Sequence, residues 1–189
     1  MKLYMIRHGE TDWNRSGKVQ GLTDIELNAK GIEQANQMKN MLKDVEFDIC
    51  FCSPLKRARK TAEIIANDKC NVNVDDLLIE RSFGKYEGKN LKEENIDIVK
   101  LWSFNDDYNY CGVEPMEDLL NRADMFIKKI KSEYKECSNV LIVSHGGFIK
   151  GLYYSVNGYN ENTDFLSFHL NNCEVYECEI LEKRNSIKK

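Results

Sequence analysis

Hydrophobic and polar positions along this chain follow two alternating patterns. Short apolar runs that end in small or charged residues occur at KLYMIRH (residues 2–8), FDICFCS (47–53) and NVLIVSHGG (139–147). Longer stretches with helical period separate these runs, and such an alternation is typical of βαβ units with parallel strand pairing. The pattern therefore predicts an α/β fold, a three-layer sandwich in which helices flank a mainly parallel central sheet.

Two of the helical stretches each present one apolar face. Spacings of three and four residues place side chains on the same side of a helix. From Asn28 onward these positions are Ile32, Ala35, Met38 and Leu42, and farther along they are Met116, Leu119, Leu120, Ala123, Phe126, Ile127 and Ile130. Both stretches are predicted to be helices that face the core.

Local signals predict the boundaries of further elements. Ser53 precedes Pro54, and serine as the N-cap with proline at the first helical position is a common helix start, so we expect a helix over 56–65 directly after a strand. Residues 165–181 alternate on both sides of an Asn-Asn pair, which predicts two strands joined by a turn. The final residues 184–189 are expected to be frayed.

Length and composition fit one ordinary globular domain. The chain has 189 residues, of which 42% are hydrophobic and 31% charged, enough for a sizeable core. Its net charge of −4 gives the whole molecule no attraction for nucleic acid or an anionic membrane, and we expect neither as a partner. The apolar run before Arg7 is too short for a signal peptide or a membrane span, so a cytoplasmic location is expected.

The seven cysteines carry no metal signal. They occur at positions 50, 52, 70, 111, 137, 173 and 178, without CxxC spacing. In a reducing compartment such residues usually act as small buried hydrophobes. Zinc binding through Cys50 and Cys52 would need partners that no spacing suggests, so we predict no bound metal and no cofactor.

Residues 89–111 form the one long stretch without a clear period and are predicted to be an insertion. The stretch is acidic and contains Trp102, Phe104, Tyr108 and Tyr110. These aromatic side chains either cover an active site or pack as a satellite cluster on the sheet. The residue pattern leaves both possibilities open.

Two histidines directly follow predicted strands. The segments are Arg7-His8-Gly9 and Ser144-His145-Gly146-Gly147. Ligands of α/β sheets bind outside the carboxyl ends of the strands, so the two imidazoles are expected to converge on one crevice. His169 lies inside an alternating segment with no glycine or charge beside it, and we assign it to structure.

The segment SPLKRARKTA (53–62) suggests a phosphate pocket, because a helix N-terminus and nearby cations favour anions. Arg57 and Arg59 lie in the opening turns, rotated by roughly 200° from each other on a helix of 3.6 residues per turn. Arg57 lies one turn from Ser53 and is expected to point inward, while a solvated basic face is the alternative interpretation. Glu80, ahead of a glycine-punctuated loop, is by itself a weak signal.

Together these segments resemble the histidine phosphatase superfamily. The motifs occur in family order: RHGET (7–11), SPLKRARKTA (53–62), Glu80 before FGKYEG (83–88), and SHGG (144–147). The similarity extends through GIEQA (31–35) and LNNC (170–173). It implies a phosphoglycerate mutase-like fold, similar to the branch of broad-specificity and α-ribazole phosphatases. It also implies a single domain over 1–189, with 89–111 as a substrate-facing insertion.

The resemblance further implies roles for individual residues. By position in the motifs, His8 is the nucleophile, Glu80 is the proton donor, and Arg7, Arg57 and His145 bind the phosphoryl group, with Asn14 and Gly146 as further phosphate contacts. The chain departs from the family at Gly112-Val113-Glu114-Pro115, where many relatives have GGES; Glu114 remains, and Arg122 occupies an arginine position on the next helix. The departure puts only local capping in doubt.

These residue types suit phosphoryl transfer without a metal. Negative charge spreads over the equatorial oxygens of the transition state, and Arg7, Arg57 and a cationic His145 would stabilise it. A neutral nitrogen of His8 can attack phosphorus in line while a hydrogen bond to the opposite nitrogen fixes the tautomer. Glu80 would protonate the leaving alkoxide and then activate the water that completes hydrolysis.

The sequence accordingly predicts a metal-independent phosphomonoesterase that acts on a small phosphorylated metabolite. A cofactor-dependent phosphoglycerate mutase ranks second, because the family's mutases carry longer insertions than 89–111. A catalytically idle phospho-ligand binder ranks lower, since such members usually lose the nucleophile or the acid, and both His8 and Glu80 remain. The physiological phosphomonoester, for example α-ribazole phosphate or phosphoserine, stays open, as does the choice between a monomer and a homodimer.

Overall fold

A single five-stranded sheet organises the computed structural model, which describes residues 1–104 and 107–180. The strands are β1 (Lys2–Arg7), β2 (Ile49–Cys52), β3 (Val72–Val74), β4 (Asn139–Ser144) and β5 (Val175–Glu179). They lie in the order β3-β2-β4-β1-β5, and only the pairing of β5 with β1 is antiparallel. The predicted α/β fold with a mainly parallel sheet is confirmed.

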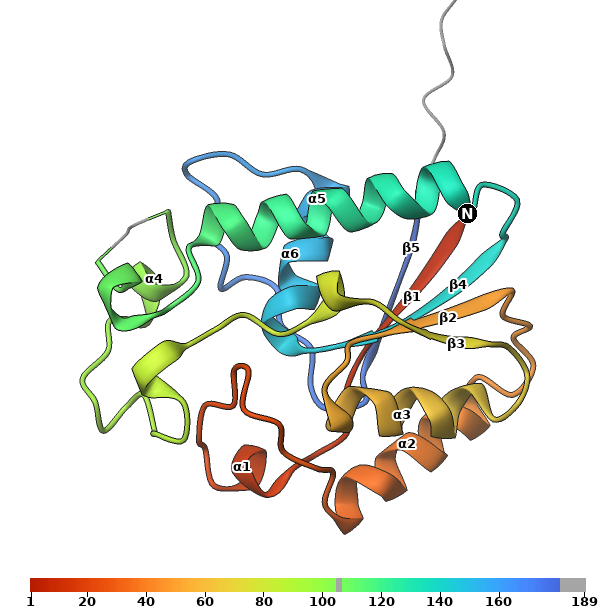
Figure 1. Ribbon diagram of the computed structural model, residues 1–189, viewed down its shortest axis with the longest axis horizontal. Helices are drawn as coiled ribbons and strands as arrows, with labels where there is room; N and C mark the ends of the chain where they lie inside the picture. The colour runs from red at the N-terminus through yellow and green to blue at the C-terminus, as the bar shows by residue number, and fades with distance from the viewer. Residues whose placement is uncertain (105–106, 181–189) are drawn as a thin grey trace, which may run out of the picture.

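Helices cover both faces of this sheet and complete the three layers (Figure 1). The helices are α1 (Asp12–Arg15), α2 (Ala29–Met41), α3 (Lys56–Ala66), α4 (Ile98–Leu101), α5 (Met116–Glu133) and α6 (Gly146–Asn157). The pair α2 and α3 lies on one face and the pair α5 and α6 on the other, while α1 and α4 lie beyond the carboxyl ends of the strands. Among the described residues, no helix is long and apolar enough to cross a bilayer.

Alternation along the strands divides the core into two layers. Leu3 and Met5 pack with the α5 and α6 side, whereas Tyr4 and Ile6 pack with the α2 and α3 side. Successive side chains of a strand point to opposite faces, so one short apolar run supplies both layers. All seven predicted core positions of α5 are buried, which confirms the expectation for that helix.

Two local expectations about helices are wrong. Ile32 is 41% exposed on α2, because the buried face of that helix turns through Gly31, Ala35 and Met38 instead. The helix after β2 begins at Lys56 as its spacing predicts, but its N-cap is Leu55 and not Ser53. The Ser53 hydroxyl is occupied by a different partner, described below.

The predicted first strand of the C-terminal pair is also absent. β5 is a strand as expected, but residues 165–170 have no strand structure. Carbonyl groups of this segment accept hydrogen bonds from side chains: Phe165 and Phe168 from the Lys150 ammonium, and Leu170 from the Arg7 guanidinium. These tertiary contacts replace the ladder that the alternating pattern suggests. The predicted fraying of 184–189 lies outside the described residues.

Residues 89–104 and 107–111 contribute to a small apolar cluster that is separate from the two core layers of the sheet. Leu101 and Cys111 are buried in this cluster with Phe83, Tyr86 and Val113. Tyr108 and Trp102 pack against it from its edge. One of the two open possibilities, a satellite cluster, is therefore present in the fold.

The cysteines are free thiols in the described structure. Cys50 and Cys52 are fully buried on β2, where burial raises the pKa of Cys50 well above its ordinary value and that of Cys52 to about 11. Both therefore stay protonated at neutral pH and act as small core residues. Within the ranges that the structure covers, no group of three or more His, Cys, Asp or Glu side chains is arranged to hold a metal ion.

Candidate active site

A cavity of about 380 Å³ lies at the carboxyl ends of β1 and β4. Among its lining residues are six expected from the sequence, Arg7, His8, Asn14, Arg57, Glu80 and Gly146. His145 lies beside it, with its ring centroid 5.2 Å from that of His8. The two imidazoles meet because β1 and β4 are parallel neighbours, and the amide of His8 donates to the Ser144 carbonyl at 2.9 Å.

His8 is held in one tautomer. Its Nδ1 lies 2.7 Å from the Gly9 carbonyl oxygen, which can only accept, so Nδ1 carries the proton and Nε2 carries a lone pair. Burial, followed by the charges of Arg57 and Arg7, lowers the pKa of His8 well below its ordinary value. The imidazole is therefore neutral at pH 7 and has the form that a nitrogen nucleophile requires.

The turn after His8 is pressed against the first turn of α2. A Cβ on Gly9 would lie 2.5 Å from the Gly31 carbonyl oxygen, and a Cβ on Gly31 would lie 2.2 Å from the Glu10 carbonyl oxygen. Only glycine allows this approach of two backbones. The Glu10 amide also donates to Gln34 Oε1 at 2.8 Å. The GIEQA motif thus fixes the loop that carries His8.

His145 is oriented by a residue whose role the sequence did not reveal. Its Nε2 lies 2.7 Å from the Ser53 hydroxyl, and its buried Nδ1 has no partner among the described residues. Burial, then Arg57 and His8, lower the pKa of His145 well below its ordinary value. The prediction of a cationic His145 is therefore wrong, because an imidazole with a pKa this low is neutral at pH 7. If Ser53 donates to Nε2, Nδ1 keeps a proton that it can donate to an anion.

Two arginines contribute positive charge to the cavity. Arg57 is fully buried and donates from both terminal nitrogens, to the Thr23 and Gly21 carbonyls at 2.8 Å each. Arg7 donates to the Leu170 carbonyl at 2.8 Å. Burial lowers the pKa of Arg57 to about 10 and also that of Arg7, and both stay charged at pH 7. The Nε atoms of both arginines are buried without a partner in the described structure.

Glu87 of the FGKYEG motif holds the loop on which Arg57 rests. Its carboxylate accepts from the Leu22 amide at 3.0 Å and from the Thr23 amide and hydroxyl at 3.0 and 2.6 Å. The same loop presents the two carbonyls that bind Arg57. Glu87 therefore positions Arg57 through this loop, a connection that only the tertiary structure reveals.

Glu80 is anchored at the N-terminus of α6. Oε1 accepts from the amides of Arg81 at 2.8 Å and Phe148 at 3.0 Å, and Oε2 accepts from the amide of Gly147 at 3.1 Å. Oε2 thus receives a single hydrogen bond from the described residues and retains a lone pair. Gly146, the first residue of the helix, also lies in this N-terminal turn, whose amides have no acceptor within the helix.

The backbone that leads to Glu80 is held by a half-buried ion pair. Arg122 contacts Glu114 through two nitrogens, at 2.8 and 2.9 Å, and donates to the Leu77 and Ile79 carbonyls at 2.6 and 3.0 Å. Pro115 is the N-cap of α5 and provides no side-chain hydrogen bond. The departure from GGES therefore removes a cap and leaves the clamp in place.

Close packing makes Gly147 a sensitive position. A Cβ there would lie 2.5 Å from Glu80 Oε1 and 3.2 Å from the Trp102 ring. We expect Gly147→Ala to displace the Glu80 carboxylate and to lower kcat/KM by roughly 10–10², the range in which a small misplacement near the chemistry acts. Gly151→Ala is the matched control on α6, since its Cβ would make contacts of 3.4 Å or longer. Equal losses in both variants would contradict this assignment.

Several residues that line the cavity were not predicted. They include Lys18, Gln20, Trp102, Lys150, Leu166 and His169. The assignment of His169 to a structural strand is wrong, because its segment is not a strand and its side chain is exposed beside the cavity. Trp102 brings the stretch 89–111 to the cavity, whereas the Phe104 ring meets Phe165 edge-on and lies tilted against Tyr159. The one sequence signal for a role of Trp102 at the cavity was its aromatic side chain in a stretch without a clear period.

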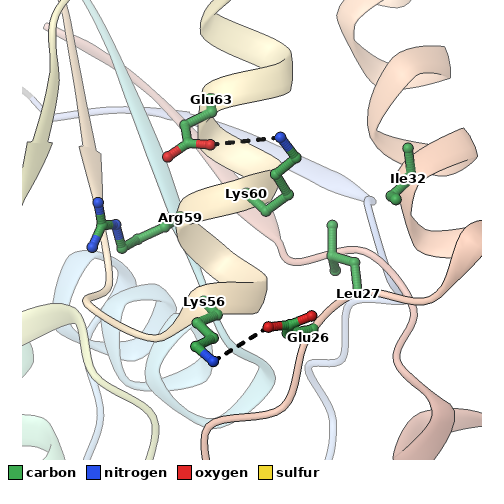
Figure 2. Close-up of a pocket in the computed structure, with 7 residues that line it drawn as sticks. All are labelled: Glu26, Leu27, Ile32, Lys56, Arg59, Lys60 and Glu63. Atoms are coloured by element: carbon green, nitrogen blue, oxygen red, sulfur yellow. Dashed lines mark hydrogen bonds and ion pairs between the residues drawn. The ribbon is translucent and has the colours of Figure 1, made fainter.

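A separate surface hollow of about 330 Å³ lies between α3 and the residues around Leu27 (Figure 2). Arg59 lines this hollow and is exposed, so it does not share the cavity with Arg57. The other cations of the hollow are paired, Lys56 with Glu26 at 3.2 Å and Lys60 with Glu63 at 3.8 Å. The two arginines of SPLKRARKTA thus point in different directions, as their helical spacing predicts.

Comparisons with known proteins agree with this geometry. A family model described as histidine phosphatase superfamily (branch 1) matches residues 3–189. The chain is 38% identical over 187 residues to the uncharacterized phosphatase PhoE of Bacillus subtilis, covering 97% of this chain and 91% of the relative. It is 33% identical over 156 residues to the adenosylcobalamin/alpha-ribazole phosphatase of Escherichia coli, covering 79% and 75% of the two chains.

A solved structure shares the fold. The phosphoserine phosphatase of Entamoeba histolytica, in complex with 3-phosphoglyceric acid, superposes with a TM-score of 0.81 at 35% identity, covering 93% of this chain and 89% of that one. The fold and these relatives place the chain among the phosphoric monoester hydrolases. It belongs to the histidine phosphatase superfamily, branch 1.

Proposed function

We propose that the protein is a metal-independent phosphomonoesterase that hydrolyses a small phosphorylated metabolite through a phosphohistidine on His8. The observation that carries this proposal is a set of three buried nitrogens, Arg7 Nε, Arg57 Nε and His145 Nδ1, that have no partner among the described residues. Buried polar groups are rarely left unpaired, so three at one site favour an anion with several oxygens as the ligand. A phosphoryl group has this chemistry.

The proposed reaction has two half-reactions. His8 Nε2 attacks phosphorus and forms a P–N bond as the P–O bond to the leaving group breaks, and Glu80 gives its proton to the departing oxygen. The hydrogen bond from Nδ1 to the Gly9 carbonyl then supports the positive charge on the phosphorylated ring. In the second half-reaction water attacks phosphorus, Glu80 takes a proton from that water, and the P–N bond breaks to release phosphate.

The remaining site residues would bind the phosphoryl oxygens. The Oδ1 of Asn14 accepts from the Thr11 amide and the Asn172 side chain, at 3.1 and 3.2 Å, which leaves its NH₂ group as a donor to phosphate. Gly146 would add its amide from the N-terminus of α6. Trp102 supports a substrate-facing role for the stretch 89–111, since its ring lines the cavity. These phosphate-binding residues do not specify the leaving group of the substrate.

A trapping experiment tests the proposal. Brief reaction with a radiolabelled phosphomonoester, followed by a quench in base, is expected to leave label on His8, because a phosphoramidate survives alkali and is lost in acid. Turnover is expected to be unchanged by a chelator. His8→Ala is the control and should carry no label.

Four outcomes would contradict the proposal. Label on serine, cysteine or aspartate would exclude a phosphohistidine, and chelator inhibition that added metal reverses would exclude a metal-independent reaction. Interconversion of phosphoglycerates that depends on bisphosphoglycerate, without comparable hydrolysis, would favour the mutase instead. Phosphate binding without any turnover would indicate an idle binder.

A further inference from the structure

Lys150 is a buried cation that the proposed reaction does not use. It lies in the second turn of α6, is 6% exposed and lines the same cavity as His8 and Glu80. Its ammonium donates to the carbonyls of Phe165 and Phe168 and lies 5.1 Å from the centroid of the Trp102 ring. The two carbonyls use two of its three N–H groups, and one remains.

The charges around the cavity do not balance. Arg7, Arg57 and Lys150 line it, as does the exposed Lys18, and within residues 1–104 and 107–180 none of the first three forms an ion pair with a carboxylate. Glu80 is the one acidic residue among the described lining residues. Arg81, which is 3% exposed, also donates to backbone carbonyls, those of Glu114 and Leu101, but it does not line the cavity, whereas the half-buried Arg122 pairs with Glu114 at 2.8 Å. A buried charge that meets only neutral acceptors is costly, and an anionic ligand offsets that cost.

A phosphate dianion in contact with Arg7 and Arg57 accounts for two of these three charges. Lys150 is a third, held against Trp102 by the 165–170 segment, whose Leu166 and His169 also line the cavity. A leaving group that extends from the phosphate along Trp102 would meet this ammonium. The group that would pair with the Lys150 ammonium is a second negative charge on the substrate.

We propose that Lys150 and Trp102 form a subsite for a carboxylate on the leaving group, so that the preferred substrate is a phosphomonoester of a hydroxy acid. This inference rests on the proposed phosphatase activity and adds the substrate class. The carboxylate would accept the remaining N–H of Lys150, and Trp102 would cover the short carbon chain between the two anionic groups.

The protonation of Lys150 fits this role. Burial lowers its pKa to about 8, against the opposing influence of Asp164 and Glu80, and His169 lies on the neighbouring segment with its own pKa lowered by burial, Arg7 and Lys150. The ammonium is thus mostly charged at pH 7 and loses its proton as the pH rises through about 8. Preference for a carboxylate should weaken over the same range.

Matched substrate pairs test the subsite. Phosphoserine differs from phosphoethanolamine by its carboxylate, and 3-phosphoglycerate differs from glycerol 3-phosphate by a carboxylate in place of a hydroxymethyl group. We expect kcat/KM of the wild-type protein at pH 7 to favour the acid of each pair by roughly 10–10², the range of one hydrogen bond to a charged group. In Lys150→Met this ratio should fall to about 1, and in Lys150→Arg it should persist to higher pH than in wild type.

Lys60→Met is the control for loss of one positive charge, since Lys60 is exposed and paired with Glu63 away from the cavity. Its ratio should equal that of wild type. A wild-type ratio near 1, or an unchanged ratio in Lys150→Met, would overturn the subsite while hydrolysis of all four esters would still support the phosphatase. Absence of hydrolysis that depends on His8 would instead overturn the phosphatase proposal. If Lys150→Met does not fold, the subsite is tested by the wild-type ratio of kcat/KM within each substrate pair and by the pH dependence of that ratio in Lys150→Arg.

Discussion

Arg57→Ala is expected to lower kcat/KM by about 10²–10³, the loss that commonly follows removal of one donor to transition-state charge. Arg57 is fully buried, and its Nε has no partner in the described structure. Its terminal nitrogens are fixed by the Gly21 and Thr23 carbonyls, so the guanidinium needs little reorganisation when charge develops on the phosphoryl oxygens. Steady-state kinetics on a phosphomonoester measure the effect.

Arg59→Ala is the matched control, because it removes the same side chain two residues away on the exposed face of α3. Its kcat/KM should remain within about twofold of wild type, as is usual for exposed positions. Thermal unfolding must accompany the kinetics, since Arg57→Ala leaves two carbonyls without their donor. Equal and mild losses in both variants would show that Arg57 does not bind the reacting phosphoryl group.

Glu80→Gln is expected to impair alkyl phosphates much more than aryl phosphates. An alkoxide leaves poorly without a proton, whereas nitrophenolate leaves well, so the burst phase with p-nitrophenyl phosphate should lose little and the rate with glycerol phosphate should fall by about 10²–10⁴, the usual contribution of a general acid. Glutamine preserves the shape and can still accept at its carbonyl oxygen. Dephosphorylation should also slow with both substrates, because the base for water is gone.

Pre-steady-state rates separate this role from a structural one. A Glu80 that only anchors α6, through the amides of Gly147 and Phe148, would give the same modest loss with both substrates. Such equal sensitivity would transfer the acid role to another group. Glu87 and Glu114 are poor substitutes, because their carboxylates already bind the Thr23 loop and Arg122.

The sequence predicted the elements that arise from local periodicity. The apolar stripe of α5 and the position of α3 after β2 follow from spacing within one segment. Expectations failed where a distant contact competed with the local pattern. Residues 165–170 alternate like a strand, yet their carbonyls bind Lys150 and Arg7. Serine is a common N-cap residue, yet the hydroxyl of Ser53 forms a hydrogen bond with His145.

The sequence by itself determined that His8 and His145 follow apolar strands, and parallel neighbours then bring both to one edge of the sheet. Only the tertiary structure decided how each is held. Ser53 meets His145 across 92 residues, Glu80 meets Gly147 across 67, and Arg7 meets Leu170 across 163. Local patterns encode burial and helical phase, whereas the partner of a buried polar group is selected by the packing of distant segments. For that reason the sequence did not predict that Lys150 lines the cavity.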